Sequence, residues 1–192
     1  MSENGQLLFF CIIGYLFGSI PFGKLAGNIL GIDIQKKGSG NIGFANVRRH
    51  LGWRAGLAVL AGDMLKGYAP VALTANYLSG WQVLTVAAFV LGGALFSVWL
   101  GFKGGKGVAT TVGYSLAINF LIGAAAGLIY LAGTAFFRKS APASLVAIWT
   151  LPVMAVFISW IHGLFFLLAA LVITWAHRDN VRHIKRHAKW FR

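Results

Sequence analysis

Acidic residues, cysteine and charge in general are scarce in this chain. Only 11% of its 192 residues are charged, and four residues in all are Asp or Glu. A soluble domain carries about a quarter charged residues, so the composition argues against a soluble fold. The one cysteine, Cys11, excludes an intramolecular disulfide and any metal site built from several cysteines. Because metal-ligand spacing is also missing, we expect neither a metal nor another cofactor.

Apolar residues dominate instead. They make up 58% of the chain, and the mean hydropathy is +0.73. Runs long enough to cross a hydrocarbon core about 30 Å thick recur along the whole length. We therefore predict an all-α, polytopic integral membrane protein that forms a single domain over residues 1–192. The first run, from Leu7 onward, could be a signal peptide, but it lacks a basic leading region and further spans follow, so we interpret it as a retained helix.

Positive charge predicts the topology. The net charge is +13, and the basic residues gather in residues 36–54, 103–106, 138–139 and 178–192. Since cationic loops stay in the cytoplasm, all four segments are expected there. Anionic lipid headgroups account for a further part of the basicity, and nucleic acid is not an expected partner.

This placement predicts about seven transmembrane helices, with the N-terminus outside and the C-terminus inside. Residues 112–137 must then cross twice, and the Gly- and Ala-rich residues 123–127 are the expected turn between two short helices. A last hairpin is expected to turn at residues 161–163. Five spans is the alternative, in which residues 112–137 cross once and the last two runs merge.

Two expected spans contain polar interruptions. The first, residues 7–30, is broken around Pro21, which indicates either a packing kink or a nearby polar cavity. The second, residues 54–78, contains Asp63 and Lys66 at helical spacing. A pair of opposite charges three residues apart favours a local ion pair, and a functional cavity is the alternative. The third span is expected over residues 81–100.

The loop at residues 101–111 reads GFKGGKGVATT and lies between two apolar runs. Glycines let backbone N–H groups converge on an anion, and lysines supply positive charge beside it, so the composition favours a phosphate site. Gly107 stands where a Walker A loop has Ser or Thr, so a nucleotide is not implied. An equal alternative is a Gly-rich turn whose lysines only mark the cytoplasmic side.

Two further polar segments are expected on the same face. Residues 36–50 combine glycines, small polar side chains and flanking cations, and Asn46 and Arg49 would share one face of a helix that opens toward an anion. His177 and Asn180 share a face where the last helix leaves the membrane. Three clusters so rich in donors and so poor in acids should bind phosphate or a phosphate ester.

In this order, residues 18–21, 38–49, 63–67, 101–110 and 177–180 resemble the bacterial acyl-phosphate:glycerol-3-phosphate acyltransferases of the PlsY type. The resemblance covers residues 14–182. It implies a seven-helix enzyme of the bacterial inner membrane with a cytoplasmic active site, acting in phospholipid synthesis. Such an enzyme transfers an acyl group from acyl phosphate to the 1-hydroxyl of glycerol 3-phosphate and gives lysophosphatidic acid. The implied partners are these two substrates, membrane lipids and the enzyme that produces acyl phosphate.

The resemblance also implies residue roles. Its catalytic residues would be His177, Asn180 and Lys103, with either His177 or a substrate phosphate oxygen as the base. Since acyl phosphate is an activated anhydride, no enzyme nucleophile is needed, and the task is to hold two phosphates and stabilise the oxyanion. The substrate-binding residues would be Ser39, Gly40, Asn41, Gly43, Asn46, Arg49, Gly104, Gly105, Lys106, Gly107, Thr110 and Ser144.

The chain departs from the usual family pattern at four positions, and the acidic residue expected past Asn180 is also absent, with Ile184 and Lys185 in that region. Ala45, Ala94, Ser97 and Ala141 stand where Thr, His, Pro and Ser are usual. Because the phosphate-binding residues are intact, we expect activity to be retained. Two rival hypotheses remain: a transporter or flippase for an anionic phosphate ester, with Lys24, Asp63 and Lys66 as its mid-membrane charges, and a non-catalytic lipid-binding scaffold.

Overall fold

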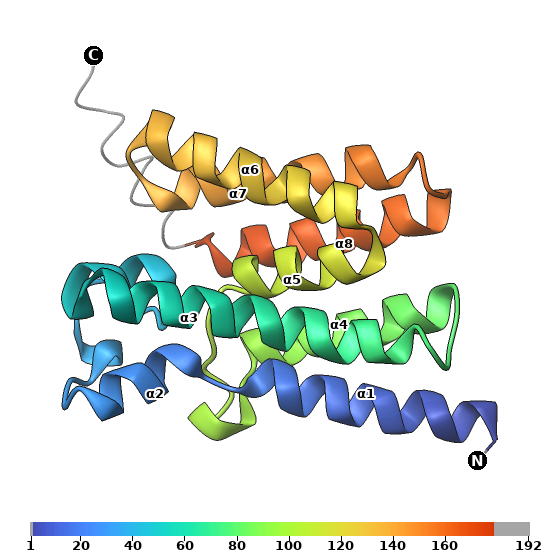
Figure 1. Ribbon diagram of the computed structural model, residues 1–192, viewed down its shortest axis with the longest axis horizontal. Coiled ribbons are helices and arrows are strands. Elements are labelled where there is room, and N and C mark those ends of the chain that lie inside the picture. The colour runs from blue at the N-terminus through green and yellow to red at the C-terminus, as the bar shows by residue number, and fades with distance from the viewer. Residues whose placement is uncertain (1, 179–192) are drawn as a thin grey trace. The chain divides into compact units, whose positions relative to one another are not determined.

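The computed structural model describes residues 2–178, and within them every regular element is a helix (Figure 1). The all-α prediction is therefore confirmed for this part of the chain. The α-helices are α1 (Glu3–Ser19), α2 (Phe22–Ile29), α3 (Phe44–Thr74), α4 (Trp81–Leu95), α5 (Val108–Ile118), α6 (Phe120–Phe137), α7 (Ser140–Ala155) and α8 (Trp160–Ala176). Two short 3-10 helices, η1 (Ile34–Lys36) and η2 (Val98–Leu100), lie in the loops.

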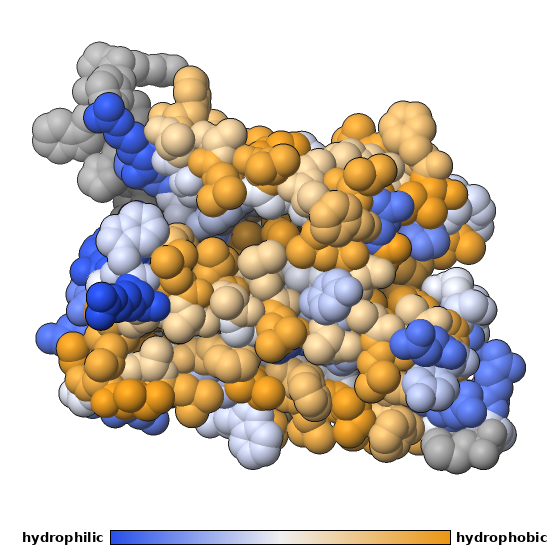
Figure 2. All heavy atoms as spheres, in the orientation of Figure 1, coloured by the Kyte–Doolittle hydropathy of each residue, from blue (hydrophilic) through white to orange (hydrophobic). Residues whose placement is uncertain are grey.

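Three helical segments among the described residues are long and apolar enough to cross a membrane. They are Glu3–Ile29, which joins α1 and α2, Trp81–Leu100 and Phe120–Phe137. The helices α5, α7 and α8 are apolar but shorter. Large apolar side chains remain exposed along these helices, as lipid contact requires. Over the first 125 residues, hydrophobic surface lies between hydrophilic ends (Figure 2).

The chain forms two compact units, residues 1–125 and residues 126–192. In the first unit, α1 packs against α4 and α3 against α5. Glycines permit these contacts: a Cβ at Gly18 would collide with the backbone of Val90, and a Cβ at Gly67 with the carbonyl oxygen of Thr110. Small residues of this kind let membrane helices approach closely. In the second unit, α7 packs against α8.

The first apolar segment is interrupted as predicted. Helix α1 ends at Ser19, and α2 starts at Phe22 after Pro21, which has no backbone N–H to donate. Two buried side chains bond the carbonyl oxygens at this break. The hydroxyl of Ser97 donates to the oxygen of Ser19 at 2.6 Å, and the ammonium of Lys66 donates to the oxygen of Ile20 at 2.9 Å. The break between α1 and α2 is therefore a joint that two side-chain hydrogen bonds stabilise.

Helix α3 contains a break that the sequence analysis did not predict. Gly52 has φ 88°, in the left-handed region that favours glycine, so the helix changes direction there. The first two turns fold back on the rest: a Cβ at Gly56 would lie 3.1 Å from Cα of Arg48. A buried cluster of Ile34, Ile42, Val47 and Val59 fills the angle between the two parts.

Two predicted turns were wrong. The Gly- and Ala-rich residues 123–127 continue α6, and the turn lies at Asn119, where the backbone is extended and the side-chain oxygen accepts from the N–H of Ile122 at 3.2 Å. The last hairpin turns before Ser159, not at residues 161–163. The Ser159 hydroxyl caps the start of α8 by accepting from the N–H of His162 at 3.4 Å. In both cases a polar capping side chain, not glycine, begins the new helix.

Candidate functional site

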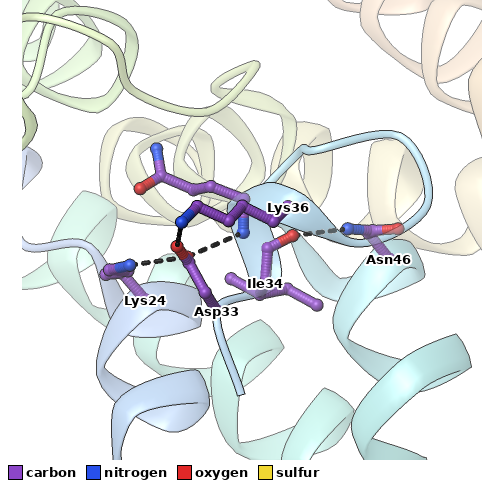
Figure 3. Close-up of polar contacts among 6 residues, drawn as sticks. Lys24, Asp33, Ile34, Lys36 and Asn46 are labelled. Atoms are coloured by element: carbon purple, nitrogen blue, oxygen red, sulfur yellow. Dashed lines mark hydrogen bonds and ion pairs between the residues drawn. The ribbon is translucent and has the colours of Figure 1, made fainter.

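The side chain of Asn46 holds the polar loop at residues 36–43, called the first loop below. Its nitrogen donates to the carbonyl oxygens of Ile34 at 3.4 Å and Lys37 at 3.0 Å, as Figure 3 shows for Ile34. Its oxygen accepts from the backbone N–H of Ser39 at 3.3 Å. With an exposed fraction of 3%, Asn46 lies inside the loop and fixes its shape.

Asp33 and Lys24 form a second tie beneath the first loop. The Lys24 ammonium lies 2.6 Å from one carboxylate oxygen of Asp33, and the other oxygen is 3.9 Å from the Lys36 ammonium (Figure 3). The hydrogen bond from Lys24 lowers the pKa of Asp33, and the N–H of Gln35 lowers it further. This pair could not be predicted from the sequence, because the two residues lie nine positions apart, which is no helical spacing.

The first loop ends at the start of α3. The side-chain oxygen of Asn41 accepts from the N–H of Gly43 at 3.3 Å, and the Ser39 hydroxyl accepts from the N–H of Asn41 at 3.4 Å. Gly43 is the N-cap of α3 and gives no side-chain cap. The first N–H groups of a helix lack a partner one turn earlier, so this end carries partial positive charge. It can attract an anion.

Residues 101–107, called the second loop below, are fixed from behind by α4. The N–H groups of Gly104 and Gly105 donate to the carbonyl oxygens of Leu95 and Ala94, each at 2.9 Å. A Cβ at Gly104 would lie 2.7 Å from the Leu95 oxygen and collide with that of Ala94, so only glycine fits here. The loop ends at Gly107, whose φ of 76° starts α5.

The two loops meet within the first unit. A Cβ at Gly105 would lie 3.8 Å from Oδ1 of Asn41 and 3.6 Å from Cγ1 of Ile42, an ordinary contact distance. Ile42 is supported from below by α2, because a Cβ at Gly23 would collide with its carbonyl oxygen. The structure therefore brings together two glycine-containing loops, each of which opens the helix that follows it.

The remaining predicted residues of this unit lie around the loops. Lys103 is exposed and Lys106 is half-buried, both in the second loop. Arg49 is exposed one turn after Asn46 on α3, whereas the Asn46 side chain is buried against the first loop. Thr110 is buried in the first turn of α5, against Gly67 of α3.

Two predicted site residues lie in the described part of the second unit. Ser144 lies in α7, where its hydroxyl donates to the oxygen of Ser140 at 2.8 Å. His177 is the C-cap of α8, and its Nδ1 lies 2.9 Å from the carbonyl oxygen of Ile173. Since a carbonyl only accepts, Nδ1 carries the proton and Nε2 is the acceptor of the neutral ring. Asn180 lies outside the described residues.

Ala94 and Ser97, two of the residues that depart from the family pattern, contact the second loop. The backbone oxygen of Ala94 accepts from Gly105, as described above. Ser97 joins the break after α1 to the same loop, because its own carbonyl oxygen accepts from the N–H of Phe102 at 2.8 Å.

Within residues 2–178, no group of three His, Cys, Asp or Glu side chains could hold a metal ion.

Comparison with known proteins shows which family the chain resembles in sequence and in structure. The family model described as glycerol-3-phosphate acyltransferase matches residues 8–187. The Agrobacterium fabrum (strain C58) protein of that name is 42% identical over 180 residues, covering 90% of this chain and 85% of its own. The Geotalea daltonii protein is 42% identical over 183 residues, with 91% and 92% covered. The crystal structure of PlsY, an integral membrane glycerol 3-phosphate acyltransferase, in its glycerol 3-phosphate form, superimposes with a TM-score of 0.90 at 29% identity over 94% of this chain and 92% of that one.

Proposed function

Because this chain belongs to the glycerol-3-phosphate acyltransferase family, we propose that it transfers a fatty acyl group from acyl phosphate to the 1-hydroxyl of glycerol 3-phosphate. The products are lysophosphatidic acid and phosphate, for phospholipid synthesis. The observation that carries the proposal is the contact between the two loops at Gly105 and Asn41. Two anion sites side by side suit a reaction between two phosphate compounds.

The chemistry needs no covalent enzyme intermediate. The 1-hydroxyl oxygen attacks the carbonyl carbon of acyl phosphate, the bond from that carbon to the phosphate oxygen breaks, and phosphate leaves. The hydroxyl proton goes to a base. The protein has to hold two anions together against their repulsion and to stabilise the charge that develops on the carbonyl oxygen.

The first loop and the start of α3 form the glycerol 3-phosphate side of the proposal. The Ser39 hydroxyl and the Asn41 amide nitrogen supply donors, and the exposed guanidinium of Arg49 offers two parallel bonds to one phosphate. Gly40 and Gly43 contribute by leaving room for the ligand, because their N–H groups already bond Lys37 and Asn41. Asn46 contributes by another route, since both ends of its amide already bond the loop. We assign it the role of holding Ser39 in place.

The second loop and the start of α5 form the acyl phosphate side. Lys103 and Lys106 carry positive charge that would stabilise the negative leaving phosphate. Gly104, Gly105 and Gly107 keep the backbone free of side chains, and Thr110 lies in the first helical turn, where unpaired N–H groups attract an anion. Ser144 belongs to the same proposed substrate-binding set.

Two groups remain candidates for the base. His177 and Asn180 would orient the attacking hydroxyl, and Nε2 of neutral His177 can accept its proton. A phosphate oxygen of either substrate is the alternative. Replacement of His177 by Gln separates them, because a substrate base leaves the pH dependence of the rate unchanged.

The chain would act as one domain of the bacterial inner membrane, with its site facing the cytoplasm. We propose that the joined segment α1–α2 and the six helices α3 to α8 make the seven crossings, and three of these segments are long and apolar enough to cross by themselves. The basic loops support a cytoplasmic C-terminus and an external N-terminus. The expected partners remain membrane lipids and the enzyme that produces acyl phosphate.

The transporter alternative loses support from the ion pairs. It required Lys24, Asp63 and Lys66 to serve as charges on a solute pathway. Lys24 is paired with Asp33, and the Lys66 ammonium lies 2.7 Å from Oδ1 of Asp63. Charges neutralised within the protein in this way are poor binding sites for a passing anion.

The test is acyl transfer by the purified protein. Labelled glycerol 3-phosphate is offered with palmitoyl phosphate, and separately with palmitoyl coenzyme A or a thioester of acyl carrier protein. Lysophosphatidic acid should form from acyl phosphate alone and be lost in Arg49→Ala and Lys103→Ala, while the exposed Lys139→Ala should keep the wild-type rate. No product from any donor would refute the proposal, and uptake of label into proteoliposomes would then support the transporter.

A further inference from the structure

A second group of arginines lies at the break in α3, outside the proposed substrate site. The guanidinium carbon of Arg48 lies 4.5 Å from the ring centre of Trp53 and 5.7 Å from that of Phe44. The two rings are themselves 6.1 Å apart. A cation held against aromatic rings is oriented in advance, which lowers the entropy lost when it binds a ligand.

The break in the helix creates this arrangement. Gly52 turns the chain at φ 88°, so Trp53 returns beside Arg48 instead of continuing along a straight helix. The backbone of Arg48 lies against Gly56, where no larger residue fits without displacing it. The arrangement is thus fixed by the backbone.

The arginines of this group lack acidic partners. Within residues 2–178, the ion pairs of the acidic side chains go to Lys24, Lys36 and Lys66, and none goes to Arg48 or Arg54. Both arginines are exposed. Stacking covers the flat face of the Arg48 guanidinium and leaves the N–H groups at its edge for an oxyanion.

The position of the group relative to lipid indicates what that oxyanion is. Trp53 is 60% exposed, and Leu57 and Leu65 follow it along α3 with 52% and 60% exposed. This side of α3 is therefore lipid-facing, and Arg48 and Arg54 lie at its N-terminal end. Figure 2 shows hydrophilic residues at this end of the first unit, where Figure 1 draws the start of α3, beside hydrophobic surface. A tryptophan and basic residues at such a boundary lie at headgroup depth.

We propose that Arg48, stacked on Trp53 and Phe44, binds the headgroup phosphate of an anionic phospholipid from the surrounding bilayer. Arg54, one residue beyond Trp53, is a further exposed cation at this end of α3. The site is separate from the substrate loops and does not depend on the proposed reaction. It would hold the break in α3 at a fixed depth in the membrane.

The experiment is a lipid titration of the full-length protein in a non-ionic detergent, followed by native mass spectrometry. The probes are dioleoyl phosphatidylglycerol and dioleoyl phosphatidylcholine, without substrates. We expect phosphatidylglycerol to bind more tightly, and Arg48→Gln to weaken it about fivefold. Trp53→Leu should also weaken it although the charge is unchanged, while Lys139→Gln, which removes an exposed charge elsewhere, should leave it at the wild-type affinity.

Three outcomes would overturn the proposal. These are equal binding of the two lipids by the wild type, unchanged binding in Arg48→Gln, or an equal loss in Lys139→Gln, which would indicate unspecific charge attraction. If Arg48→Gln does not fold, Arg48→Lys keeps the charge without the flat face and should still weaken phosphatidylglycerol binding. Unchanged binding in Arg48→Lys would equally refute the stacked site.

Discussion

The ammonium nitrogen of Lys66 lies 2.9 Å from the carbonyl oxygen of Ile20, at the point where α1 ends. It also lies 2.7 Å from Oδ1 of Asp63, one turn earlier on α3. The lysine thus replaces the hydrogen bond that the next helical turn would have given to Ile20. Because α2 begins at this break and carries Gly23 beneath Ile42, the same lysine helps to position the first loop.

Replacement of Lys66 by Met should destabilise the protein strongly. It leaves the carboxylate of Asp63 buried without its cation, a change that costs about 3–5 kcal/mol. We expect a large fall in the thermal unfolding midpoint in detergent. The double variant Asp63→Leu with Lys66→Met removes both charges and should recover part of the loss. A single variant as stable as the wild type would contradict this account.

Ser97→Ala should show whether the joint after α1 positions the second loop. The variant leaves the carbonyl oxygen of Ser19 without the hydroxyl that lies 2.6 Å away, at a cost of about 1–3 kcal/mol. Thr85→Ala is the control, because the Thr85 hydroxyl bonds only the carbonyl four residues earlier in its own helix. We expect Ser97→Ala alone to lower both the unfolding midpoint and the rate of acyl transfer. Equal effects in the two variants would refute a special role for Ser97.

The Asp33–Lys24 pair predicts a loss of stability in acid. The hydrogen bond from Lys24 places the folded-state pKa of Asp33 below its ordinary value of about 4. A lowered pKa contributes stability above the unfolded-state value, and that stability is lost as the pH falls through the folded value. The thermal unfolding midpoint should therefore decrease as the pH is lowered below about 4. Asp33→Asn should be less stable than the wild type at pH 7 and lose less stability in acid; parallel pH profiles would contradict the assignment.

Features that depend on neighbours in the sequence could be predicted. The break at Pro21 follows from the missing N–H of proline. The ion pair of Asp63 and Lys66 follows from their spacing of three residues, about one helical turn. The turn expected at residues 123–127 was wrong because glycine and alanine are tolerated inside apolar membrane helices. Asn119 and Ser159 carried the usable signal, since both are residues that cap helices.

Features that depend on folding could not be predicted. The types of residue in the two loops indicated phosphate binding, but not that Asn46 turns its amide inward to the loop backbone. The tie from Asp33 to Lys24 crosses a break between helices, and the bond from Ser97 to Ser19 spans 78 residues. Only the packing of α1 on α4 brings the last pair together.

Gly104→Ala tests whether the shape of the second loop matters for catalysis. Its Cβ would lie 2.7 Å from the Leu95 oxygen and closer to that of Ala94, both backbone atoms of α4 that cannot move away cheaply. The loop, with Lys103 and Lys106, must then shift by an ångström or so, and misplacement of that size costs about 100-fold in rate. Gly92→Ala is the matched control, since it lies in the interior of α4 with open space around its Cβ. We expect the control to keep the wild-type rate at saturating substrate, and Gly104→Ala to lose about two orders of magnitude while still eluting as a folded protein. A Gly104→Ala rate within twofold of the control would mean that the proposed reaction does not depend on the bonds from Gly104 and Gly105 to α4.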